Sequence, residues 1–318
     1  MNKHEILREF FIRSEGSQKK INFFLGDNPE SAKCLKEHNN DREQLYLKII
    51  SDFALPDMSR RGNISNAKEK LTETNSLTNL AKNINTLLLS ETETFDEWHK
   101  NACECIINDN KESNIPITYG QAQKLVNMSL KYIYCLKDFN TNTNVTAWHM
   151  TLDSYTLNWI AQHLYKPTGR GNQTELSDTI NIKDLAKLSG CFSSSKDEFK
   201  DKSEEEIENI IKEKIKTLSK FVENIKWNNL DDNGYKFLQK KIKEFLDTDP
   251  PFIAEFYIWP QMQIELIEKN IQKDMKTLTK YTEVISHLSV ESDNATHIHI
   301  NDIEKKIDGF LANLKDSL

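Results

Sequence analysis

The chain has 318 residues, of which 37% are hydrophobic and 29% are charged, with a formal net charge of −7. Its 9 glycines and 7 prolines are too few for a sheet-rich fold, which needs many tight turns. We therefore predict an all-α, multi-helix fold. The acidic net charge does not by itself predict nucleic-acid binding, although residues 114–170 carry five Lys or Arg against two Asp, a local charge of +3.

The five cysteines are odd in number and contain no CxxC pair, so they do not predict a zinc site or a disulfide framework. Free thiols are typical of a reducing cytoplasm. No apolar run reaches membrane-spanning length, and the first residues do not lead into a signal-peptide core. We expect a soluble cytoplasmic protein with no membrane association.

The N-terminal part is predicted to be helical. Residues 4–14 form a helix that Gly16 ends, residues 30–54 form a second helix closed by Pro56, and residues 65–90 form one or two more. Between them, residues 59–63 are predicted to be a loop. Its adjacent Arg60 and Arg61 are interpreted as solvated, with a phosphate contact as the alternative.

A further helix is predicted to begin after Thr94, which has the N-cap position of a capping box with Glu97. Its buried stripe is expected to contain Trp98, Ala102, Cys105 and Ile106. We interpret His99 as a surface or hydrogen-bonded histidine, with a functional role as the alternative.

Downstream of residue 165, the pattern predicts a basic loop at 166–172 and helices at 181–190, 197–225, 235–246, 261–288 and 302–316. The apolar run 252–259 is ambiguous between a short buried strand and an extended segment that lines a pocket. A loop pair, His297 and His299, would need further ligands to bind metal. Three regions are expected: an N-terminal helical region (1–94), a candidate catalytic core (95–262) and a C-terminal helical extension (263–318).

The stretch 119–160 contains two amphipathic helices joined by a short polar connection. Thr118 is predicted to cap the first helix with Gln121 at the box position. Lys124 and Lys131, two turns apart, project from one side of that helix. The second helix begins near Asp153, an acid in an apolar setting.

A lysine and an aspartate held together form a possible catalytic pair. A carboxylate stabilises positive charge that develops on a sugar carbon when its bond to a base breaks, and a neutral amine can attack that carbon. An apolar wall of Met128, Tyr132 and Trp148 would favour the neutral amine. The alternative is a solvated helix lysine at 124 and a helix-capping carboxylate at 153.

The segments KLVNMSLKY, from Lys124 to Tyr132, and HMTLDS, from His149 to Ser154, resemble the helix-hairpin-helix DNA glycosylases. The similarity is greatest to the divergent archaeal 8-oxoguanine branch, which has a second lysine seven residues after the catalytic one. It covers about 45 residues and implies a two-lobed core, with Lys124 as the nucleophile and Asp153 as the catalytic carboxylate. The hairpin of that family carries two or more glycines before the lysine, whereas this chain has only Gly120.

The resemblance implies a pocket for a base that leaves the DNA stack. The candidate substrate-binding residues are Trp98, Tyr119, Gly120, Gln121, Asn127, Lys131, Trp148, His149 and Trp259.

These features are compatible with two functions. The first is a DNA glycosylase, with or without lyase activity, that acts on double-stranded DNA with a damaged or modified base, for example in phage DNA, and uses no metal or cofactor. The second is a non-catalytic helical protein that interacts with other proteins in a defence or regulatory assembly. A helical nuclease is a weaker third option, because the chain has no Arg-x4-His pattern.

Overall fold

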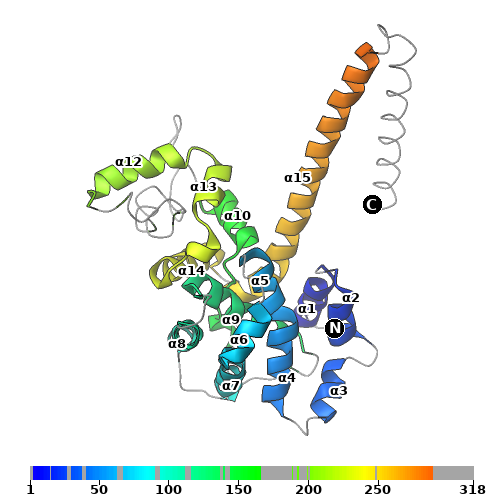
Figure 1. Cartoon of the computed structure of the whole chain (residues 1–318), viewed down its shortest axis with the longest axis vertical. Coiled ribbons are helices and arrows are strands. Elements are labelled where there is room, and N and C mark those ends of the chain that lie inside the picture. The colour runs from blue at the N-terminus through cyan, green and yellow to red at the C-terminus, as the bar shows by residue number, and fades with distance from the viewer. Residues whose placement is uncertain are drawn as a thin grey trace. The chain divides into compact units, whose positions relative to one another are not determined.

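The structure is a computed structural model, and it describes residues 3–14, 16–26, 30–37, 41–62, 67–89, 94–111, 116–136, 144–165, 201–247 and 249–288, with residues 139, 188, 192 and 199. The predicted all-α fold is confirmed, because these residues form helices and no β-strand (Figure 1). The one bridge among them joins Phe192 to Ile225. The chain divides into two compact units, Met1–Met262 and Gln263–Leu318.

The first helices are α1 (Lys3–Ser14), α2 (Gln18–Leu25), α3 (Glu30–Glu37) and α4 (Arg42–Ile49). Gly16, at φ +64°, follows α1 as predicted, since glycine adopts this left-handed conformation without steric cost. The single helix predicted for residues 30–54 is wrong, because it is divided between α3 and α4.

Helix α4 runs without a break through a π-helical turn (Ile50–Ala54) into α5 (Leu55–Gly62). Pro56 was expected to end a helix and instead lies in the first turn of α5. The π turn just before it widens the backbone, which accommodates a ring that has no N–H and crowds the carbonyl four residues earlier. The loop predicted at residues 59–63 is therefore wrong at Arg60 and Arg61, which are helical.

Next come α6 (Ala67–Glu73), α7 (Ser76–Leu89) and α8 (Phe95–Asp109). Two helices in residues 65–90 agree with the prediction. Helix α8 begins after Thr94 as expected, but no side chain caps it, so the predicted capping box with Glu97 is wrong. Its buried face contains Cys103 in place of the expected Cys105, because Cys103 lies one turn from the buried His99.

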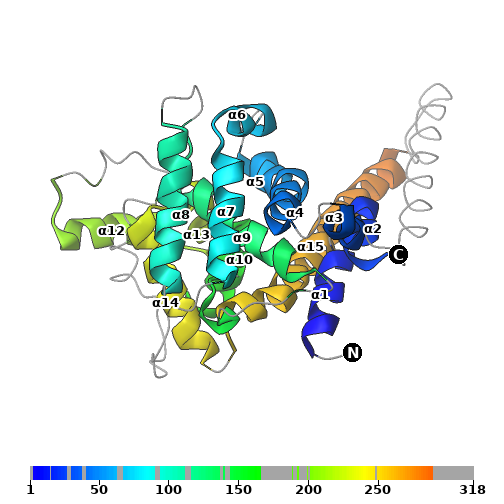
Figure 2. The same ribbon diagram turned by 90° about the horizontal axis from the view of Figure 1, so that it is seen from below.

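Helix α9 (Tyr119–Tyr134) lies inside the first unit and packs against α4, α5, α8 and the 3-10 turn η5 (Trp227–Asn229) (Figure 2). Its start is confirmed, since Thr118 and Gln121 form both bonds of a capping box. Every residue from Gly120 to Tyr134 is buried. The prediction of an amphipathic helix is therefore wrong, and the polar residues of α9 must find partners inside the protein.

The remaining helices among the described residues are α10 (Ser154–His163), α12 (Glu204–Lys214), α13 (Leu218–Asn224), α14 (Asp232–Leu246) and α15 (Pro251–Leu288). The single helix predicted for residues 197–225 is wrong, because Ile215 ends α12 and Thr217 caps α13. The run 252–259 begins α15 and is neither strand nor extended. A run that is apolar on every face lacks the periodicity that distinguishes a helix from a strand.

Several predictions lie outside the described residues. These are the loop at 166–172, the helices at 181–190 and 302–316, and the pair His297 and His299. In the part of the chain that the structure describes, no helix is long and apolar enough to cross a membrane.

Candidate active site

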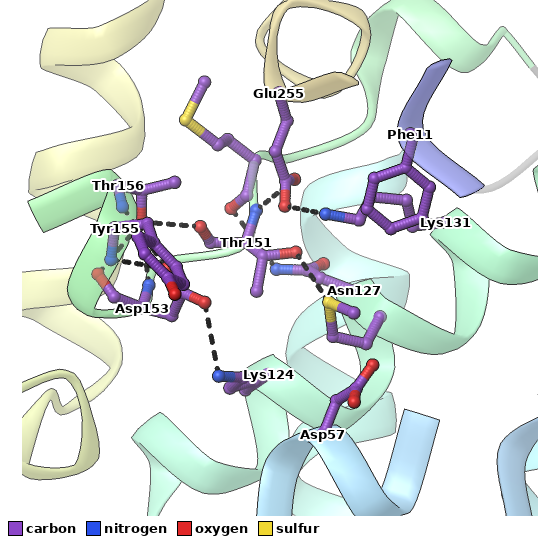
Figure 3. A network of polar contacts seen from close by, with 12 residues as sticks. Phe11, Asp57, Lys124, Asn127, Lys131, Thr151, Asp153, Tyr155, Thr156 and Glu255 are labelled. Atoms are coloured by element: carbon purple, nitrogen blue, oxygen red, sulfur yellow. Dashed lines mark hydrogen bonds and ion pairs between the residues drawn. The ribbon is translucent and has the colours of Figure 1, made fainter. Parts of the chain in front are cut away.

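Lys124 and Asp153 meet inside the protein. The Lys124 Nζ lies 3.2 Å from Oδ2 of Asp153, and less than 5% of either side chain is exposed (Figure 3). Asp153 is also the N-cap of α10, because its Oδ1 accepts the backbone N–H of Tyr155 and of Thr156 at 2.9 and 3.2 Å. One carboxylate oxygen thus caps a helix while the other receives the amine. The capping role considered for Asp153 and its pairing with Lys124 exist together.

The 3-10 turn η5 covers the amine. The ring of Trp227 lies 4.7 Å from the Lys124 Nζ, a cation–π contact, and Thr118 donates its hydroxyl hydrogen to the Asn228 carbonyl at 2.8 Å. A Cβ atom at Gly120 would lie 2.0 Å from the Trp227 carbonyl oxygen. Gly120 is therefore the residue that allows the backbone of η5 to approach the start of α9.

Asp153 ends an extended segment, Met150–Asp153, whose backbone bonds to buried side chains. Thr151 donates its N–H to Oε2 of Glu255 at 2.7 Å, and Asp153 donates its N–H to the Thr156 hydroxyl at 2.7 Å. The same hydroxyl donates to the Thr151 carbonyl at 2.8 Å. These bonds substitute for the partners that a sheet would supply.

Two glutamines hold the alternate residues of the segment. Gln123 donates to the Leu152 carbonyl at 2.8 Å and accepts the Leu152 N–H at 3.4 Å. Gln239 of α14 does the same for Met150, at 2.5 and 3.2 Å. Four consecutive N–H groups are therefore satisfied by side chains of α9, α10, α14 and α15.

Lys131 pairs with Glu255. The Lys131 Nζ lies 2.5 Å from Oε1 of Glu255, both side chains are fully buried, and the Phe11 ring lies 4.3 Å from the amine. Burial raises the pKa of Glu255, and the Lys131 ammonium opposes that shift. Because Glu255 also accepts the Thr151 N–H, Lys131 neutralises a carboxylate that supports the segment leading to Asp153.

A second polar chain runs beside α9. His149 bonds through Nε2 to Asp96 at 2.6 Å and through Nδ1 to the Tyr235 hydroxyl at 3.1 Å, and that hydroxyl lies 3.2 Å from Nε2 of His99. Asn127 donates to the same hydroxyl at 2.8 Å. Complete burial holds the pKa of His99 well below its usual value, and the bond from His149 lowers the pKa of Asp96.

A third buried group anchors the N-terminal helices to α9. Lys20 lies 3.0 Å from Oδ2 of Asp57, and the Tyr132 hydroxyl bonds to both side chains. Tyr132 was expected to form part of an apolar wall for Lys124. Its ring does pack in the core, against Phe24 at 5.8 Å, but its hydroxyl belongs to this ionic group.

The other predicted substrate-binding residues are dispersed. Trp98 donates to the Asn83 carbonyl, Trp148 packs on Phe252 at 4.9 Å, and Gln121 belongs to the capping box of α9. Tyr119 packs on Tyr235, and Trp259 packs on Tyr155 near Lys131. The structure thus brings Lys124 and Asp153 into contact. Tyr119, Asn127 and His149 all contact Tyr235. Trp98 lies in the core between α7 and α8. Their roles in binding DNA stay predictions.

Sequence reasoning missed Gln123, Gln239, Glu255, Trp227 and Tyr235. One signal was available, since Glu255 is the only charged residue in an eight-residue apolar run and a buried acid needs a partner. The glutamines had no such signal, because polar residues at these positions fit the solvated faces that α9 and α14 were expected to have.

Within the described residues, no cluster of three or more His, Cys, Asp or Glu could hold a metal ion. No protein-family model, curated protein or solved structure matches the chain. The geometry of the site brings one amine and one carboxylate together out of water.

Proposed function

We propose that the chain is a DNA glycosylase that excises a damaged or modified base, with Lys124 and Asp153 as its reacting groups. The observation that supports this proposal is the buried contact of 3.2 Å between the amine and a carboxylate that also caps α10. The glycosylase resemblance assigned the nucleophile and the carboxylate to these two residues.

The two groups have complementary tasks. As the bond between C1′ and the base nitrogen breaks, its electron pair leaves with the base and positive charge develops on C1′, where the Asp153 carboxylate stabilises it. The Lys124 amine then forms a bond to C1′ and passes a proton to Asp153, to which it is hydrogen-bonded. The sugar ring opens as the C1′–O4′ bond breaks and O4′ takes up that proton, which leaves a Schiff base between Lys124 and C1′. The Schiff base permits strand cleavage by elimination of the 3′ phosphate. Asp153 is a proton acceptor within reach of the amine, because the Lys124 Nζ lies 3.2 Å from its Oδ2.

Substrate entry requires a movement at the site. Lys124 and Asp153 are each less than 5% exposed, and Trp227 lies over the amine. The C1′ atom of a nucleotide that leaves the DNA stack can approach the Lys124 amine only if η5 or the start of α10 moves aside. We place that movement at Trp227, because its ring lies 4.7 Å from the amine and belongs to a three-residue turn.

Borohydride trapping tests the proposal. The protein is mixed with duplexes that carry 8-oxoguanine, modified bases of the kinds found in phage DNA, or an abasic site, and is then reduced. A covalent protein–DNA band on one modified-base duplex, lost in Lys124→Gln and retained in Lys236→Gln, is expected. Lys236 is the control for incidental amines, since it lies on the exposed face of α14. Asp153→Asn is expected to slow base release.

A non-catalytic interaction protein is the second candidate. Its supporting observation is on α15, where Ile264, Leu266 and Ile267 are 51%, 41% and 53% exposed although all three are large and apolar. Apolar surface of this kind is typical of a protein-binding helix. Absence of base release and of a trapped band across the panel, combined with a change in particle mass by light scattering in Ile264→Lys/Ile267→Lys, would favour this function.

A further inference from the structure

The contact between Lys124 and Asp153 is accompanied by a second contact between their chain neighbours. Gln123 precedes Lys124 on α9, and Leu152 precedes Asp153 on the extended segment. Gln123 holds Leu152 by both backbone groups, with its amide N donating to the carbonyl at 2.8 Å and its amide O accepting the N–H at 3.4 Å. Two adjacent residues of one element therefore bond to two adjacent residues of the other.

Gln123 is itself held in place. It donates to the Gly120 carbonyl one turn earlier, and its Oε1 accepts from Asn127 one turn later at 3.2 Å. It is fully buried, so water cannot replace these bonds. Its side chain has one orientation that satisfies every contact, which makes it a rigid spacer between α9 and Leu152.

We propose that Gln123 is a positioning residue that sets the separation between the Lys124 amine and the Asp153 carboxylate. This inference rests on the proposed function. The backbone of Leu152 leads directly into Asp153, so a shift of Leu152 relative to α9 is transmitted to the carboxylate within one residue. Asp153 and Lys124 react with the same sugar carbon, and a displacement of about 1 Å in such a pair lowers the rate by about a hundredfold.

The chain contains a matched control. Gln239 forms the same two bonds to Met150, three residues before Asp153, and is also buried. Gln123→Met and Gln239→Met each leave one backbone N–H and one backbone carbonyl of the segment without a side-chain partner, and Gln123→Met also removes the bonds to Gly120 and Asn127. A role in folding alone therefore predicts a larger loss of stability in Gln123→Met with an unchanged rate constant in the folded protein, whereas positioning predicts a lower rate constant in Gln123→Met alone.

The first measurement is single-turnover base release on the best duplex of the trapping panel. Gln123→Met is expected to lower the rate constant about 10- to 100-fold with DNA affinity unchanged. Gln239→Met is expected to stay within about threefold of wild type, since Met150 is more distant from the carboxylate. Gln123→Glu, which keeps the acceptor for the Leu152 N–H and loses the donor, provides an intermediate test if Gln123→Met does not fold.

The second measurement does not require activity. Reductive methylation with formaldehyde and borohydride, read by mass spectrometry, reports how accessible the Lys124 amine is. Faster methylation of Lys124 in Gln123→Met than in Gln239→Met or wild type is expected. Equal methylation in both variants, or equal losses of rate, would overturn the positioning role. Faster methylation of Lys124 in Gln123→Met, combined with no base release by the wild-type protein, would overturn the glycosylase proposal while the spacer role stands.

Discussion

Helix α9 carries two buried lysine–carboxylate pairs seven residues apart, and the pairs differ in how each carboxylate is held. Asp153 receives two backbone N–H groups of α10 in addition to Lys124. Glu255 receives one backbone N–H, from Thr151, in addition to Lys131. Asp153 is thus well satisfied without its lysine, whereas Glu255 depends on its lysine much more.

The surroundings differ as well. Lys131 and Glu255 are both fully buried under Phe11 and α15, whereas Lys124 is covered by the short turn η5 through the ring of Trp227. A pair that is enclosed by long helices and whose members depend on each other supports the fold. The Asp153 carboxylate is oriented by α10 independently of its lysine, and a turn of only three residues covers Lys124. This pair is therefore suited to release its amine to a substrate.

The largest expected effect comes from removing Lys131. Lys131→Met leaves the Glu255 carboxylate buried without its counter-ion, and loss of one partner of such a pair costs about 3–5 kcal/mol of unfolding free energy. Lys124→Met is expected to cost only about 1.5–2 kcal/mol, because Asp153 keeps two N–H donors. Urea denaturation of both variants measures the difference.

The double variant Lys131→Met/Glu255→Gln is the control, since it removes both charges and keeps an acceptor for the Thr151 N–H. It is expected to recover most of the stability that Lys131→Met loses. Equal losses in Lys131→Met and Lys124→Met would contradict the distinction between the two pairs.

A smaller effect separates the two roles of Asp153. Asp153→Ala removes the cap of α10 and is expected to cost about 1–2 kcal/mol, whereas Asp153→Asn keeps an oxygen that accepts the Tyr155 and Thr156 N–H groups and loses only the charge. The thermal unfolding temperature of Asp153→Asn should therefore be close to that of the wild type, and that of Asp153→Ala should be lower. Both variants are expected to slow base release, and full activity in Asp153→Asn would exclude a need for the negative charge.

The smallest expected effect is a pH dependence of stability that His99 supplies. The pKa of His99 in the folded protein lies well below its ordinary value of about 6.5, because the ring is completely buried. As pH falls below about 6.5, the unfolded chain takes up a proton that the folded protein refuses, so stability decreases with a slope of up to about 1.4 kcal/mol per pH unit. Below the folded pKa the slope disappears.

The measurement is the urea midpoint between pH 7.5 and pH 5.5. His99→Gln is expected to flatten the dependence in that range, although it also weakens the contact with Tyr235. His163→Gln, at a partly exposed position near the end of α10, is the control substitution. An unaltered slope in His99→Gln would show that another group carries the dependence.

Local signals in the sequence predicted much of the helical structure. The capping box of Thr118 and Gln121 and the start of α10 at Asp153 depend on contacts within a few residues, which a sequence displays directly. The pairing of Lys124 with Asp153, which are 29 residues apart, came instead from the glycosylase resemblance. Pro56 is an exception. Proline is a common signal for the end of a helix, but the π turn before Pro56 allows the helix to continue into α5.

The sequence by itself determined that the chain is helical and that α9 and α10 carry an amine and an acid. Only the tertiary structure decided that α9 is buried on every side, because periodicity reports one apolar face and cannot reveal partners for the polar ones. Those partners are far away in the chain: Glu255 bonds to Lys131 across 124 residues, and Gln239 bonds to Met150 across 89. Buried polar groups must be satisfied, and which residues satisfy them is set by how distant helices pack.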